Sequence, residues 1–63
     1  MGKYDENIAR AQTMLAEAQQ KYDDALIKMA GAAPHVRQHV LNTYQSEIDE
    51  AEQMIEIFTS SND

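Results

Sequence analysis

The sequence contains no cysteine and no tryptophan, and its 63 residues include one proline and two glycines. Without cysteine, the chain can form neither a disulfide nor a thiolate metal site. No apolar run approaches the roughly 20 residues that a membrane-spanning helix needs. The N-terminal stretch also lacks the apolar central region of a secretory signal. We therefore expect a soluble cytoplasmic protein.

Basic residues are also scarce, since five Lys and Arg stand against eleven Asp and Glu, for a formal charge of −6. Residues 1–33 have four basic and five acidic side chains, whereas residues 34–63 have one basic and six acidic. An acidic surface repels polyanions, so nucleic acid is not an expected ligand. The same field favours a basic protein partner.

Glycine and proline interrupt the chain at one place, the stretch AGAAPH, which contains Gly31 and Pro34. Glycine suits the end of a helix because it accepts a positive φ. Proline suits the first turn of the next helix, where its missing N–H is not needed. The sequence predicts one unit over residues 1–63, with helices at about 5–30 and 34–59, a turn at 31–34 and a frayed C-terminus.

Both predicted helices have apolar residues in heptad rows. In the first helix, large side chains alternate with alanines three positions later, in two rows: Ile8, Leu15, Tyr22, Met29 and Ala11, Ala18, Ala25, Ala32. In the second helix the rows are Leu41, Ile48, Ile55 and Tyr44, Ala51, Phe58. When the chain folds back at Ala33, two residues that face each other across the helices have numbers that sum to 66. In this register most of the large side chains face an alanine. The pattern predicts an all-α, antiparallel two-helix hairpin, coiled-coil-like, with these fourteen residues as its seam.

Acidic and basic side chains four residues apart should support the exposed side of the first helix. The expected ion pairs are Glu6–Arg10, Glu17–Lys21 and Asp24–Lys28.

Apolar residues remain outside the seam: Met14, Leu26, Ile27, Val36, Val40, Met54 and Ile57. A hairpin of this size without a disulfide or metal has a small core, so we expect another polypeptide to cover part of this surface. The candidate binding residues are the stripe on the second helix, with one residue of the first helix added: Val36, Val40, Met54, Ile57 and Met14. The pattern leaves open whether a second copy or a different protein covers them.

A catalytic site is not expected, because the sequence has no glycine-rich phosphate loop and no local nucleophile–histidine–acid signature. His35 and His39 are four residues apart on one helical face, as metal ligands require. They occur in HVRQH, which lacks the glutamate of HExxH, and a third ligand would have to come from elsewhere. We interpret the pair as polar surface and expect a non-enzymatic protein without metal or cofactor.

The stretch YQSEIDEAEQMIEIF pairs Tyr44 with Gln45, continues through an acidic segment with Ala51, and ends in isoleucines and Phe58. It resembles the second helix of the small YscE-type co-chaperones of bacterial type III secretion, which are helical hairpins of similar length. The resemblance implies a bacterial cytoplasmic protein that binds a helical-repeat chaperone and helps keep the needle subunit from polymerising early. The alternative interpretation is a self-associating four-helix bundle with a structural or regulatory role.

Overall fold

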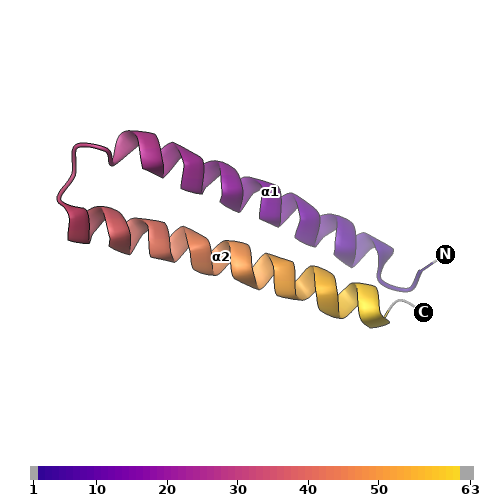
Figure 1. Ribbon diagram of the computed structural model, residues 1–63. Coiled ribbons are helices and arrows are strands. Elements are labelled where there is room, and N and C mark those ends of the chain that lie inside the picture. The colour runs from indigo at the N-terminus through magenta and orange to yellow at the C-terminus, as the bar shows by residue number, and fades with distance from the viewer. Residues whose placement is uncertain (1, 62–63) are drawn as a thin grey trace.

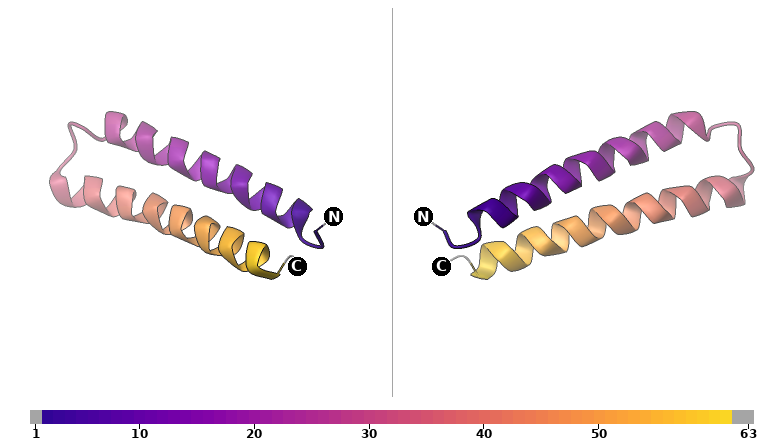
Figure 2. Two further views of the ribbon diagram at one scale, coloured as in Figure 1. Left: turned by 45° about the vertical axis from the view of Figure 1, so that its right-hand side comes forward. Right: turned by 180° about the vertical axis from the view of Figure 1, so that it is seen from behind.

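The protein is a two-helix hairpin in the computed structural model, which describes residues 2–61. Helix α1 covers Asp5–Lys28 and helix α2 covers Pro34–Ser61. The helices pack side by side and run antiparallel, so the start of α1 and the end of α2 lie together (Figure 1; Figure 2). The described part of the chain has no strand, and the predicted all-α hairpin is confirmed.

Helix α1 ends two residues earlier than predicted. The N–H of Met29 still donates to the carbonyl of Ala25 at 2.8 Å, but the N–H of Ala30 turns to Ile27 at 3.4 Å. The chain thus leaves the helix through tight turns that need no left-handed residue. Gly31 has no positive φ, so the predicted glycine cap is wrong.

Helix α2 begins at Pro34, as predicted. The carbonyl of Ala33 accepts the N–H groups of Val36 and Arg37, both at 3.0 Å, and the first helical position needs no donor. The Arg37 guanidinium reaches back across the turn to the carbonyl of Ala30 at 3.4 Å. The helix continues to Ser61, two residues beyond the prediction. The last part of the predicted frayed end, residues 62–63, lies outside the described residues.

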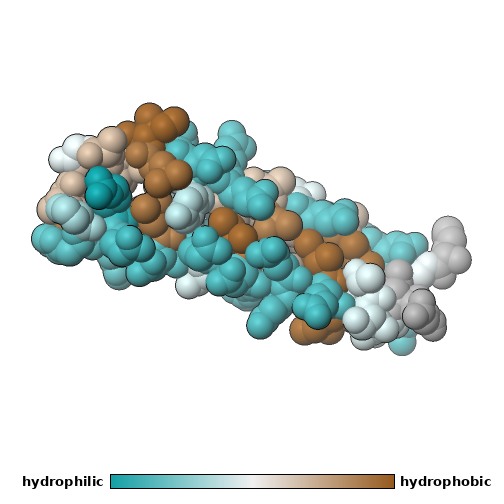
Figure 3. All heavy atoms as spheres, in the orientation of Figure 1, coloured by the Kyte–Doolittle hydropathy of each residue, from teal (hydrophilic) through white to brown (hydrophobic). Residues whose placement is uncertain are grey.

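The seam is formed by the predicted residues, all fourteen of which are buried or half-buried. The buried ones are Ala11, Ala18, Ala25, Leu41, Ile48 and Ala51. Because four of these six are alanines, the two helices can approach closely, but the core is thin. No large side chain is completely buried in the described part of the chain. In a space-filling view, apolar side chains remain visible along the line between the helices, with polar ones at the edges (Figure 3).

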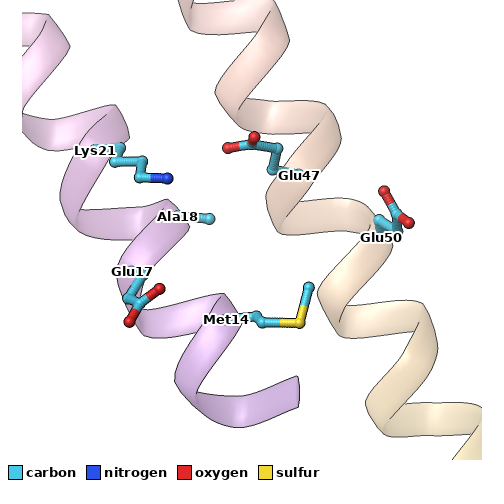
Figure 4. A pocket seen from close by; sticks show the side chains of 6 residues that line it. All are labelled: Met14, Glu17, Ala18, Lys21, Glu47 and Glu50. Carbon is cyan, nitrogen blue, oxygen red and sulfur yellow. The ribbon is translucent and has the colours of Figure 1, made fainter. Parts of the chain in front are cut away.

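Two of the three predicted ion pairs form, both on the exposed side of α1. Glu6 and Arg10 approach to 3.3 Å, and Asp24 and Lys28 to 3.1 Å. Within residues 2–61 the third predicted pair, Glu17–Lys21, does not form. The Lys21 ammonium instead points across the seam toward α2 (Figure 4). Exposed pairs of this kind contribute only about 0.3–0.5 kcal/mol each, so its absence changes little in stability.

Candidate partner-binding surfaces

The hairpin has two broad faces, one on each side of the seam. Met14 and Leu15 are consecutive in α1, so their side chains project about 100° apart. They flank the buried row of Ala11 and Ala18 on opposite sides, and each lines a different hollow between the helices. We name the two surfaces the Met14 face and the Leu15 face.

The Met14 face contains a hollow of about 230 Å³. Its lining residues are Met14, Glu17, Ala18 and Lys21 of α1, with Glu47 and Glu50 of α2. The Met14 thioether reaches toward α2, and Lys21 and Glu47 point toward one another across the hollow (Figure 4). The apolar part of the lining is Met14 and Ala18. The charged residues around it are three carboxylates and one ammonium group, so the rim of the hollow is acidic overall. This arrangement suits an apolar side chain flanked by basic groups.

The predicted binding residues do not form one compact patch. Ile57 is 60% exposed and Val36 is 42% exposed, but they lie 21 residues apart on α2. At 1.5 Å per residue, that separation is about 32 Å along the helix axis. A partner that contacts both must follow most of the length of α2.

The other residues of the stripe on α2 are less accessible to a binding partner. Val40 and Met54 are half-buried, since their heptad row lies directly beside the seam. They therefore contribute to the packing of the hairpin itself. Met14 is 46% exposed and is the one member of the predicted set that lines the hollow. The stripe thus divides into accessible residues and residues that also support the fold.

The Leu15 face contains a second, more open hollow of about 420 Å³. It is lined by Leu15, Glu52, Ile55, Glu56, Thr59 and Ser60. Sequence reasoning assigned Leu15 and Ile55 to the seam alone and missed this surface. The sequence does contain an indication of this surface, because in the predicted register Leu15 and Ile55 each face an alanine of the other helix. An alanine is too short to cover the far side of the side chain opposite, so these residues stay half-buried.

His35 and His39 are both exposed at the start of α2. In the described part of the chain, no three His, Cys, Asp or Glu side chains are arranged to hold a metal ion. Neither of the described helices is long and apolar enough to cross a membrane. Comparisons of the chain with protein families, with curated proteins and with solved structures find no match.

Proposed function

We propose that this chain is a non-enzymatic binding protein whose Met14 face packs against another protein. The observation that carries the proposal is the contrast between a core made mostly of alanine and large apolar side chains left at the surface. Burying an apolar side chain such as that of Ile57 contributes about 1.5–3 kcal/mol. A partner that covers the stripe therefore adds stability that the hairpin lacks alone.

The kind of partner follows from the shape and charge of this face. A hairpin about 48 Å long offers an apolar stripe of helical length, which fits a long groove between helices. The acidic rim of Glu17, Glu47 and Glu50 favours basic residues beside that groove. The partner also has to cover residues near both ends of α2, which a helical-repeat protein with an extended concave surface does.

The resemblance of the second helix to type III secretion co-chaperones supports a specific form of this proposal. In that form, the protein works in the bacterial cytoplasm and binds a helical-repeat chaperone. Together the two proteins hold the needle subunit and prevent its early polymerisation. The mechanism is burial of a helix face in a groove, without any covalent step.

Titration calorimetry with a helical-repeat chaperone of a type III secretion system tests this function. The double variant Val36→Ser with Ile57→Ser removes the two exposed residues of the stripe and should weaken binding at least tenfold. Met54 is left unchanged because it is half-buried and its loss would also disturb the hairpin.

The matched control is Ile27→Ser, which removes an exposed isoleucine from α1, where it is 76% exposed. This variant should bind as the unaltered chain does. If the unaltered chain does not bind the chaperone, the proposed chaperone partner is wrong. If Ile27→Ser weakens binding as much as the double variant does, the Met14 face is not the contact surface.

A further inference from the structure

The apolar stripe on α2 is nearly symmetric along its length. Counted from Glu47, Val40 lies seven residues before and Met54 seven residues after. Val36 lies eleven residues before Glu47, and Ile57 ten residues after it. The stripe thus consists of two apolar pairs about 26 Å apart along the helix axis. These apolar positions alone would fit a partner in either direction.

The charges along α2 are not symmetric. Between Pro34 and Ser46 the helix has one basic residue, Arg37, and no acidic residue. Between Glu47 and Ser61 it has five acidic residues and no basic residue. We name residues 20–46 the turn half of the hairpin, and residues 2–19 with 47–61 the open half. The two halves of α2 therefore differ in the sign of their charge.

Helix α1 brings charged residues of both signs to the Met14 face. The heptad row of Met14 continues with Lys21 and Lys28, and the adjacent row contains Lys3, Arg10, Glu17 and Asp24. Two of the basic residues are already paired within α1. Arg10 pairs with Glu6 in the open half, and Lys28 pairs with Asp24 in the turn half. Each pair therefore adds no net charge to its half.

The remaining charges of the Met14 face keep the difference that α2 shows. The turn half has two basic residues, Lys21 and Arg37, of which Arg37 lies three positions before Val40. The open half has one basic and three acidic residues, which are Lys3, Glu17, Glu47 and Glu50. The net charge of this face is thus +2 in the turn half and −2 in the open half.

We infer that the partner of the Met14 face has acidic groups opposite the turn half and basic groups opposite the open half, so that the hairpin docks in one direction. This inference rests on the proposed function, because it concerns the same surface. Opposite charges meet in one direction of docking, and like charges meet in the other. The Debye length is about 8 Å at physiological salt, so two halves whose apolar pairs lie about 26 Å apart act on the partner separately.

The hollow on the Met14 face lies at the boundary between the two halves. Lys21 and Glu47 point toward one another across it, one from each half (Figure 4). On the open side of this boundary the hollow is lined by Met14, Glu17 and Glu50. A lysine or arginine of the partner can pack its apolar stem on Met14 and direct its charged end to either carboxylate. The basic groups of the partner therefore belong opposite this side of the hollow.

Two synthetic peptides test the direction without a natural partner. Both are amphipathic helices that span about 32 Å and have the same apolar residues. One has glutamates in its N-terminal half and lysines in its C-terminal half, and the other has these charges exchanged. A nitroxide at the N-terminus of each peptide broadens the NMR signals of nearby hairpin residues. The first peptide should broaden Val36 about fivefold more than Ile57, and the second should do the reverse.

The decisive variant is Glu47→Lys with Glu50→Lys, which gives both halves of the Met14 face a positive charge. Both peptides should then lose their preferred direction. The matched control is Asp49→Lys with Glu52→Lys, which makes the same charge change in the same segment of α2. Glu52 lines the hollow of the Leu15 face, Asp49 lies three positions before it, and all four side chains are exposed. This control should keep the direction of both peptides.

Two results would overturn the inference and leave the proposed function intact. One is equal broadening of Val36 and Ile57 by both peptides, or the same direction for both. The other is loss of direction in the control variant as well, because total charge rather than the Met14 face would then decide. If neither peptide binds, the Met14 face does not dock a helix, and the inference and the proposed function are both wrong.

Discussion

The rings of Tyr4 and Phe58 stack at the open end of the hairpin, with centroids 5.4 Å apart and planes tilted by 32°. Tyr4 immediately precedes α1, and Phe58 lies in the last turn and a half of α2. The ammonium of Lys3 lies 5.4 Å from the centre of the Tyr4 ring. The pair joins the two helices at the point farthest from the turn.

Shortening Phe58 should loosen this end. Full burial would make Phe→Ala cost about 3–5 kcal/mol, and Phe58 is half-buried, so we expect about 2 kcal/mol for Phe58→Ala. Phe58→Leu keeps most of the apolar contact and should lose only the ring term, about 0.5–1.5 kcal/mol. Urea unfolding followed by circular dichroism measures both. A Phe58→Leu variant as stable as the unaltered chain would contradict a specific ring contact.

Ala18 is 5% exposed at the centre of the seam, and a larger side chain there should force the helices apart. Ala18→Leu should destabilise the hairpin by about 1–3 kcal/mol through overpacking. Ala16→Leu makes the same change at an exposed position of α1 and should have little effect. Thermal unfolding of the two variants gives the comparison, and equal shifts in Tm would contradict the close approach at Ala18.

Gly31 should tolerate a side chain. It has no positive φ, and a Cβ built on it meets nothing within 4 Å. Gly31→Ala should therefore stabilise the protein by about 0.4–1 kcal/mol, because alanine restricts the unfolded chain. Ala30→Gly, the reverse change in the same turn, should destabilise it by a similar amount. A lower Tm for Gly31→Ala would mean that the turn needs the freedom of glycine.

Zinc should not bind with defined stoichiometry. His35 and His39 are exposed, and two imidazoles alone leave two tetrahedral positions without protein ligands. Calorimetry with micromolar zinc should show only weak, non-saturating heat. A tight one-to-one isotherm that His39→Ala abolishes would contradict this prediction.

The seam was predictable because its signal repeats. Leu41 and Ile48 occupy one heptad row and face alanine rows on α1, so several layers agree on one register. Pro34 identified the start of α2 because a proline without an N–H donor fits a helix start and disrupts a helix interior. Predictions that rest on backbone chemistry or on a repeated pattern therefore agreed with the structure.

Features that depend on a choice between local contacts were not predictable in the same way. Gly31 permits a positive φ but does not require one, and tight turns ended α1 instead. Lys21 has Glu17 in its own helix and Glu47 across the seam, and spacing within one helix cannot decide between them. The Leu15 face was missed for a related reason. Heptad position indicates which side of a helix faces its neighbour, but it does not say how much of Leu15 or Ile55 that neighbour covers.

The order of contacts along the hairpin also determines how it folds. Ala25 and Leu41 are the buried residues nearest the turn on each helix, and they are 16 positions apart in the sequence. Tyr4 and Phe58 are 54 positions apart, so bringing them together first would cost about 1 kcal/mol more in loop entropy. We expect the helices to associate from the turn outward, at the high rate typical of local helical topologies. Gly31→Ala should then act mainly on the folding rate, whereas Phe58→Ala should act mainly on the unfolding rate.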